Sequence, residues 1–217
     1  MILGGNYTAI TLLGEGRVFA RPLGREDGSL LDTHGHPVTD ASFDYIYRFE
    51  EGLACAVVGD AVGAIDVSGR FVVEPVYEQT FSYNEGLASV RVAGQFGFID
   101  RQGRMVITPQ FEDDVPPYFS EGLASVSVAG RRGYIDQQGR MVIPPQFEEG
   151  SFSAAFSEGL AAVKVGGDKG RYGYIDRAGV FVINPAFSTA EPFEGGLAAV
   201  RAPTGYIDRT GAFVWHK

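Results

Sequence analysis

Hydrophobic and polar residues alternate along the chain in short runs, and this alternation predicts β-strands. In residues 86–92 every second residue, Ala88, Val90 and Val92, falls on one face of an extended chain. The residues between them form a face of mixed polarity. A period of two therefore predicts a strand that turns one face toward a core, and residues 96–100 predict a second strand after a short loop that contains glycine.

A turn separates this second strand from a third. Asp100 and Gly103 stand at the first and fourth positions of a type I turn, where their residue types are favoured. Residues 105–107 then form the third strand, which we expect to end before Pro109 because proline cannot donate to a central ladder. The segment thus predicts a three-stranded antiparallel meander followed by a linker.

The same unit recurs along the chain in a fixed register. The tetrad Glu-Gly-Leu-Ala begins at Glu51, Glu85, Glu121 and Glu158, and it recurs with one change at Gly195. A Gly-x-Ile-Asp tetrad follows each copy and ends at Asp66, Asp100, Asp136, Asp176 and Asp208. A degenerate earlier copy begins at Glu15. We therefore expect one all-β domain made of about six tandem meander repeats of 34 to 37 residues.

The register also predicts the boundaries of the units. The predicted segments are an N-terminal cap or closing segment (1–14), a degenerate repeat (15–50), four full repeats (51–84, 85–120, 121–157 and 158–194) and a truncated C-terminal repeat (195–217). A single unit cannot bury its apolar face, so neighbours must stack, with linker aromatics such as Phe111 and Phe119 between them. Two arrangements fit: an open solenoid-like array, which the short units favour, or a propeller-like ring closed when residues 7–13 complete the last unit.

The motif set resembles a known family. The pattern F-x-E-G-L-A-x-V, then G-Y-I-D-x-x-G, then V-I-P-P-x-F is clearest in residues 119–147 and 156–187 and resembles the WG-repeat family of bacterial β-repeat proteins. The tryptophan that names the family is replaced in this chain by Val62, Phe96, Arg132, Tyr172 and Thr204. The resemblance implies an all-β repeat fold that mediates interactions, with no common enzymatic activity. Because the tryptophans are absent, it supports the fold more than any binding mode that uses those rings.

Composition narrows the possible partners and the compartment. The net charge is −9, and no cluster of lysine and arginine offsets it, so nucleic acid is an unfavourable partner. Cys55 is the only cysteine, which excludes an internal disulfide and fits a reducing compartment. The N-terminal residues match no secretory signal, and no apolar run is long enough to span a membrane. We expect a cytoplasmic protein that does not enter membranes.

The chemistry-bearing residues predict neither a catalytic nor a metal site, and no cofactor. Each aspartate of the Gly-x-Ile-Asp tetrads stands alone in its turn, which favours turn capping over calcium binding. The tetrad glutamates recur in every unit and are therefore interpreted as structural. His34, His36 and His216 have no metal-ligand spacing. Cys55 falls where other copies carry serine or alanine, so we expect a packed, inert thiol.

Surface that departs from the repeat supplies the candidate binding residues. The fifth unit carries an insertion, residues 166–171, and insertions in repeat proteins tend to lie on the functional face. The candidate partner-binding residues of this loop and its equivalents are Lys169, Arg171, Asp168, Arg131, Arg132 and Arg201. An acidic rim is expected at the opposite edge, formed by Glu112, Asp113, Asp114, Glu148 and Glu149.

Three classes of function fit these features. The first is a protein–protein interaction module, such as an inhibitor or immunity-type partner of a basic protein, and the acidic rim favours it. The second is a carbohydrate-binding repeat protein, which requires Tyr83, Tyr118, Tyr172 and Tyr206 to be exposed and equivalent between units. The third is a structural scaffold for other subunits.

Overall fold

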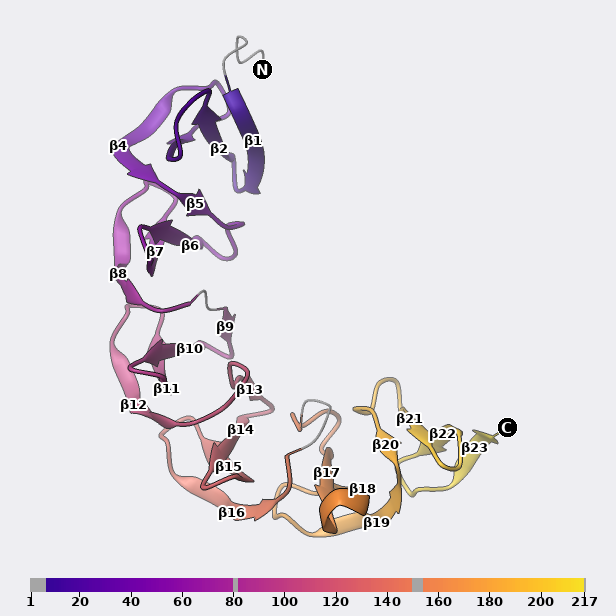
Figure 1. Cartoon of the computed structure of the whole chain (residues 1–217). Helices are drawn as coiled ribbons and strands as arrows, with labels where there is room; N and C mark the ends of the chain where they lie inside the picture. The colour runs from indigo at the N-terminus through magenta and orange to yellow at the C-terminus, as the bar shows by residue number, and fades with distance from the viewer. Residues whose placement is uncertain (1–6, 80–81, 150–153, 217) are drawn as a thin grey trace. The chain divides into compact units, whose positions relative to one another are not determined.

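The chain folds into small antiparallel β-sheets that follow one another in chain order (Figure 1). The computed structural model describes residues 7–79, 82–149 and 154–216. Within these ranges the one helical element is a short 3-10 turn, η1 (Gly167–Lys169). The all-β class predicted from the alternating pattern is confirmed.

The residues divide into two compact units. The first unit comprises Met1–Tyr83, Ala88–Ala93 and Gly97–Met105. The second comprises Asn84–Leu87, Gly94–Phe96 and Val106–Lys217.

Two sheets lie wholly in the first unit. The first contains β1 (Tyr7–Gly14), β2 (Arg17–Pro22), β3 (Gly28–Leu31) and β4 (Pro37–Phe43) in that order. The second contains β5 (Tyr45–Ile46), β6 (Leu53–Val58), β7 (Ala61–Asp66) and β8 (Phe71–Tyr77). A further sheet contains β9 (Tyr83–Asn84), β10 (Leu87–Val92), β11 (Gln95–Asp100) and β12 (Met105–Phe111).

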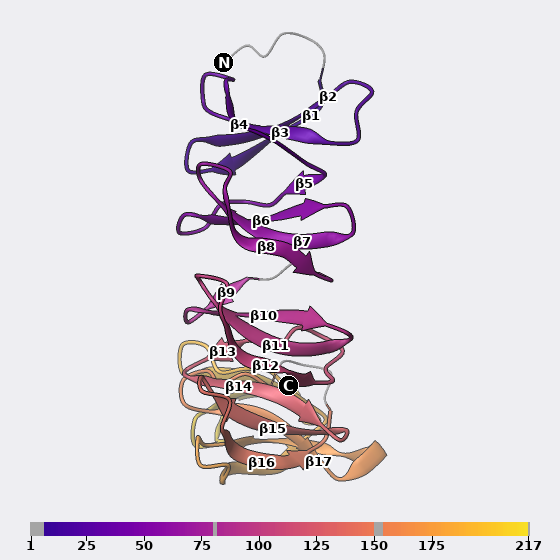
Figure 2. The same ribbon diagram turned by 90° about the vertical axis from the view of Figure 1, so that its left-hand side faces the viewer.

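Three sheets lie wholly in the second unit. The first contains β13 (Phe119–Ser120), β14 (Leu123–Val128), β15 (Arg131–Asp136) and β16 (Met141–Phe147), and the last three strands are seen side by side in Figure 2. The next contains β17 (Ala161–Val165), β18 (Arg171–Ile175) and β19 (Phe181–Phe187). The last contains β20 (Thr189–Ala190), β21 (Leu197–Arg201), β22 (Gly205–Asp208) and β23 (Phe213–His216).

Each predicted meander is present, and the linker often adds a short fourth strand. In the second sheet the linker pair Tyr45 and Ile46 is registered with Val57 and Ala56 of β6. The same addition occurs at β9, β13 and β20. The linker therefore belongs to the sheet of the repeat that follows it.

The third strand of the meander is longer than predicted. β12 continues through Pro109 to Phe111, and β16 likewise runs through Pro145 to Phe147. Both are the outermost strand of their sheet, where a missing N–H donor is tolerated. The ladder between β15 and β16 also contains register shifts beside the prolines, so these residues need not donate to it.

Both faces of the first long strand are buried, which corrects the expectation of one mixed face. In β10 the first four residues, from Leu87 to Val90, are all buried, and only the last two reach solvent. In the second unit the first five residues of β14 are buried. In the second unit, β14 lies inside its sheet between β13 and β15, and its Leu123 packs in a core cluster with Phe147 and Phe156.

The core lies between consecutive sheets, as expected for units that cannot bury their apolar faces alone. One cluster in the second unit joins Tyr174 and Ile183 of one repeat to Phe193 and Ile207 of the next. The predicted linker aromatics Phe111 and Phe119 are 3% and 2% exposed, respectively. Aromatic side chains of the linkers therefore fill the space between repeats.

The N-terminal segment belongs to the first sheet. β1 pairs with β2, with Leu12 opposite Val18 and Ile10 opposite Ala20. Among the described strands, the last sheet runs from β20 to β23 and contains no part of residues 7–13. In the described residues this segment is therefore the first strand of the first sheet.

Candidate functional site

The repeated aspartates cap the turns in which they stand. In the fourth repeat, Oδ1 of Asp136 accepts hydrogen bonds from the backbone N–H groups of Gln138 (3.0 Å) and Arg140 (2.9 Å). The same pair of bonds forms at Asp32, Asp66, Asp100, Asp176 and Asp208. The predicted turn-capping role is confirmed, and it extends to the degenerate first copy.

At Asp208 and Asp136 these hydrogen bonds favour the ionised carboxylate. At Asp208 the Thr210 hydroxyl, followed by backbone N–H groups, holds the pKa of the carboxyl below its usual value. At Asp136 burial acts to raise the pKa, but the hydrogen bonds from Arg140 and Gln138 outweigh it, and the pKa is lowered. Carboxylates that are held in the ionised form in this way stabilise their turns and are poorly suited to transfer protons.

The glutamates of the Glu-Gly tetrads form tight hairpin turns. Glu158 and Gly159 both have positive φ, 53° and 80°, between residues Ser157 and Leu160, which exchange two backbone hydrogen bonds. This is the geometry of a type I′ turn, which suits the twist of antiparallel strands. A left-handed conformation is costly for glutamate, so a compensating contact is expected.

That contact is made with the next repeat. The Glu158 carboxylate accepts the N–H of Gly196 at 3.0 Å, and the Glu121 carboxylate accepts the N–H of Gly159 at 3.0 Å. Glu15 and Glu85 make the equivalent bonds to Gly52 and Gly122. We call these contacts the glutamate staples, and they explain why the glutamate recurs.

The insertion in the fifth repeat is an ordered loop. It contains η1, seen between β17 and β18 in Figure 1, and the Glu148 carboxylate accepts the N–H groups of Gly166 (3.0 Å) and Gly167 (2.6 Å). Lys169 and Arg171 are exposed on it. The side chain of Asp168 lies outside the described residues. Glu148, predicted to belong to a solvated rim, therefore holds the loop in place.

Two of the candidate charges form a buried ion pair. Arg132 Nη1 lies 3.3 Å from Asp113 Oδ1, with side-chain exposures of 14% and 1%. Asp113 also accepts the N–H of Ser127 at 3.0 Å. Burial raises the pKa of the Asp113 carboxyl, although Ser127 and Arg132 act in the opposite sense. Asp113 is therefore not part of an exposed rim, and Arg132 is not a freely accessible contact residue, because each covers the other.

The basic loops and the acidic residues lie at the same edge of the sheets, contrary to the expected separation. In an antiparallel meander the hairpin between the first two long strands and the end of the third strand share one edge. The Arg132–Asp113 and Glu148–Gly166 contacts join these two features directly. We call this the hairpin edge.

Exposed charges of both signs remain on the hairpin edge of the second unit. The exposed cations are Arg131, Lys169, Arg171 and Arg201, and the exposed anions are Glu112, Asp114 and Glu149. Arg131 also donates to the backbone oxygen of Gln146 at 3.2 Å. Their binding role stays a prediction.

The tyrosines do not form an equivalent exposed set. Tyr118 and Tyr206 are 41% and 47% exposed, whereas Tyr172 is 5% exposed. Tyr83 is half-buried and donates its hydroxyl to the backbone oxygen of Asp100 at 3.2 Å. The condition set for carbohydrate stacking is therefore not met.

Neither a cluster of metal-ligand side chains nor a membrane-spanning helix occurs among the described residues. Across residues 7–79, 82–149 and 154–216, no three side chains of histidine, cysteine, aspartate or glutamate gather as metal ligands would. His34 and His36 stack with ring centroids 6.2 Å apart beside the Asp32 turn. In the same ranges, no helix has the length and apolar character needed to cross a membrane.

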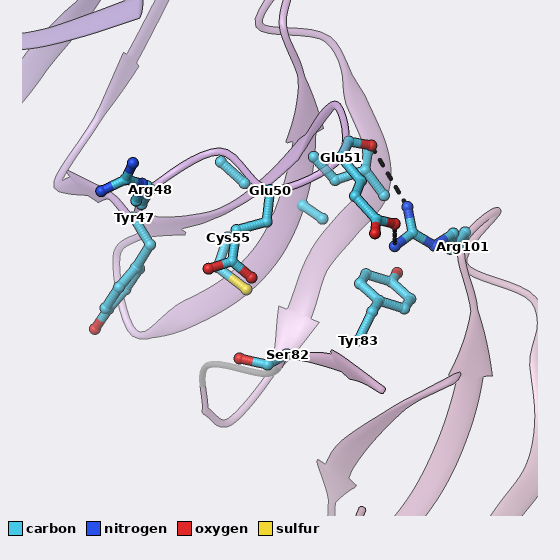
Figure 3. Close-up of a pocket in the computed structure, with 11 residues that line it drawn as sticks. Tyr47, Arg48, Glu50, Glu51, Cys55, Ser82, Tyr83 and Arg101 are labelled. Atoms are coloured by element: carbon cyan, nitrogen blue, oxygen red, sulfur yellow. Dashed lines mark hydrogen bonds and ion pairs between the residues drawn. The ribbon is translucent and has the colours of Figure 1, made fainter. Parts of the chain in front are cut away.

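A pocket in the first unit was not expected from the sequence. It is a cavity of about 340 Å³ between the turn of the second repeat and the start of the third (Figure 3). Its lining residues are Tyr47, Arg48, Glu50, Glu51, Leu53, Ala54, Cys55, Ala64, Ser82, Tyr83 and Arg101. The cavity thus gathers ionisable groups from non-equivalent positions of two repeats.

The ionisable groups on one side of this pocket contact each other. Arg101 forms an ion pair with Glu51, drawn as dashed lines in Figure 3, and its guanidinium carbon lies 5.3 Å from the centroid of the Tyr83 ring. Burial raises the pKa of the Tyr83 phenol. Cys55 is 9% exposed, which fits the expected packed thiol, but it faces the cavity.

Comparisons with known proteins identify the repeat. No curated protein sequence matches the chain. Solved structures that resemble it include Hsv2p of Kluyveromyces lactis (TM-score 0.48, 10% identity, covering 94% of this chain and 75% of that one). Another is virginiamycin B lyase from Staphylococcus aureus (TM-score 0.43, 13% identity, covering 98% of this chain and 84% of that one).

The family model for the WG containing repeat matches most of the chain. The matched residues are 29–60, 63–95, 96–131, 133–167 and 172–202. These five consecutive matches keep the period of the meanders but are offset from them: residues 133–167, for example, run from β15 of one sheet through β17 of the next. The tryptophan that gives the repeat its name is absent from them. The chain therefore belongs to the WG containing repeat family.

Proposed function

We propose that this chain is a non-enzymatic protein–protein interaction module that binds its partner at the hairpin edge. The observation that carries the proposal is the contrast between the two edges of the sheets. At one edge the aspartate turns and the Glu-Gly turns keep the same residues from repeat to repeat. At the hairpin edge the loops differ in length and charge.

The hydrogen bonds of the recurring aspartates and glutamates favour a structural role for these residues over a catalytic one. The aspartates are engaged by turn N–H groups, and the glutamate staples are engaged by the next repeat. Variable loops on a fixed scaffold are the usual arrangement of a recognition surface. The hairpin loop of the fifth repeat is held by two hydrogen bonds to Glu148, which would reduce the entropy that the loop loses on binding.

The charge of the chain favours a partner with net positive charge. A net charge of −9 attracts a basic protein over long distances and accelerates encounter. Close contacts of both signs at the hairpin edge would then fix the register of the partner. An inhibitor or immunity-type role toward a basic protein fits this distribution.

The proposal is tested by capturing a partner from lysate and measuring its affinity by calorimetry. The Lys169→Ala/Arg171→Ala and Glu112→Ala/Asp114→Ala variants change only exposed side chains of the hairpin edge. The matched control is Arg104→Ala/Arg140→Ala at the edge of the aspartate turns, where both side chains are 75% exposed.

We expect weaker binding in both hairpin-edge variants and wild-type affinity in the control. Affinity for a basic partner also falls as salt is added. Equal loss of affinity in all three variants, or loss in the control alone, would contradict the proposal. Turnover of a captured small molecule would show that the chain is an enzyme.

A further inference from the structure

The second repeat lacks an aromatic ring that later repeats carry. Ala64 stands two residues before the turn aspartate, in the Gly-x-Ile-Asp tetrad. The other copies carry a large side chain at this position, namely Leu30, Phe98, Tyr134, Tyr174 and Tyr206. Alanine removes a whole ring from the interior of a packed array, and protein interiors seldom leave such space unfilled.

In the second unit this ring fills the gap between consecutive repeats. The Tyr134 ring contacts Phe156 with centroids 5.0 Å apart, and the Tyr174 ring contacts Phe193 at 4.8 Å. Tyr134 and Tyr174 also donate their hydroxyls to backbone oxygens at 2.8 Å. Each ring thus makes one aromatic contact, edge-on for Tyr134 and tilted for Tyr174, and one hydrogen bond.

The cavity of the first unit is lined by the equivalents of a cluster that is filled in the second unit. That cluster contains Leu160, Ala162, Tyr174 and Phe193. At the same four register positions, the cavity is lined by Leu53, Cys55, Ala64 and Tyr83. Cys55 lies directly opposite Ala64 in the ladder between β6 and β7, as Ala162 lies opposite Tyr174. We call this space the Ala64 cavity.

We propose that the Ala64 cavity binds a small molecule with a single aromatic ring, which occupies the place of the missing side chain. The cavity of about 340 Å³ is large enough for one substituted ring. Tyr83 supplies the aromatic neighbour that Phe193 supplies to Tyr174. An apolar cavity in a packed core can bind a small aromatic molecule such as benzene.

The polar lining predicts the character of the substituent. Figure 3 shows the Glu50 carboxylate, Ser82 and Arg48 around the pocket, away from the paired Glu51 and Arg101. The Glu50 carboxylate accepts hydrogen bonds, the Arg48 guanidinium donates them and the Ser82 hydroxyl can do both. We therefore expect a ring whose substituent both donates and accepts, such as a phenolic hydroxyl. This binding site is independent of the proposed partner surface, which lies in the second unit.

The test uses p-cresol, which reproduces the tyrosine side chain, on the intact chain. We expect p-cresol to raise the melting temperature by mass action. The Ala64→Tyr variant fills the cavity, so it should melt higher than wild type without ligand and should bind p-cresol about tenfold more weakly or not at all. As a ring of similar size without a π-face, 4-methylcyclohexanol should give a smaller shift.

A second measurement uses the wild-type chain and therefore does not depend on whether a variant folds. Cys55 lines the cavity and is the only cysteine, so its alkylation by a small reagent reports access to the site. At a p-cresol concentration equal to its Kd, alkylation should slow about twofold. Unchanged alkylation and melting with p-cresol would overturn the proposal. Equal effects from 4-methylcyclohexanol would overturn the aromatic preference.

Discussion

The glutamate staple of the fifth repeat allows the cost of a strained turn to be separated from the value of the bond that offsets it. Glu158 has a φ of 53°, and its carboxylate lies 3.0 Å from the N–H of Gly196 in the next repeat. Glu158→Ala removes the bond and keeps the left-handed strain. Glu158→Gly removes both, because glycine adopts positive φ readily.

The expected magnitudes follow from these two terms. A hydrogen bond to a charged group contributes about 1.5–3 kcal/mol, and partial exposure of this pair places it near the lower end. Glu158→Ala should therefore lower the free energy of unfolding by about 1.5 kcal/mol. Left-handed backbone costs a residue with a Cβ at least about 1 kcal/mol, so Glu158→Gly should be about 1 kcal/mol more stable than Glu158→Ala.

Urea unfolding followed by circular dichroism measures both differences, provided that the slopes of the transitions agree. The control is Glu149→Ala, an exposed glutamate for which the expected change is within about 0.5 kcal/mol. Wild-type stability in Glu158→Ala would show that the staple contributes nothing. A glycine variant no more stable than the alanine variant would show that the turn is not strained.

Three further predictions concern the ion pair, a glycine inside β15 and an aspartate turn. Arg132→Ala should cost about 3–5 kcal/mol at pH 7, because it leaves the Asp113 charge buried, and thermal unfolding should show this loss shrinking at acidic pH, where Asp113 is protonated. Gly133→Ala should unfold at a lower temperature than Gly130→Ala, because a Cβ at Gly133 would lie 2.7 Å from a backbone oxygen, whereas at Gly130 (φ 72°) the Cβ meets no atom and adds only left-handed backbone strain. Asp136 has a lowered folded pKa, so its stabilising effect is present above the unfolded pKa of about 3.9 and is lost as the pH falls through the folded value. Asp136→Asn should therefore flatten the acid limb of a plot of stability against pH, and an unchanged limb would contradict the capping role.

The repeat architecture was predictable because its signals are local. Asp136 and Gly139 lie three residues apart in one turn, so the sequence alone predicts the turn, and the alternation in residues 86–92 predicts the strand beside it. The extension of the third strand through Pro109 was missed because proline was judged as if it stood in a central strand. At the outer edge of a sheet, the same residue is tolerated.

Contacts between repeats were not predictable in detail from one copy of the motif. Glu158 and Gly196 are 38 positions apart, and their hydrogen bond depends on how neighbouring sheets stack. The pairing of Arg132 with Asp113 has the same origin. The alternating direction of the strands in a meander could have placed Arg132 and Asp113 at one edge. The first hairpin and the end of the third strand always share that edge.

The sequence signal for the Ala64 cavity is a small residue at a repeat position where the other copies carry a large one, and no motif marks it. Ala64 looks unremarkable until it is aligned with Tyr134 and Tyr174, and no catalytic or metal-binding spacing surrounds it. Departures from a repeat at buried positions are therefore as informative as insertions at exposed ones.

Hydrogen–deuterium exchange on the complex with a captured partner tests the interaction module most directly. Partner binding should slow exchange in the hairpin loops, residues 129–131 and 166–171, because these lie on the hairpin edge. Exchange in the aspartate turns, such as residues 136–140, should stay as in the free chain. Protection confined to the aspartate and Glu-Gly turns, with unchanged exchange in the hairpin loops, would contradict the account.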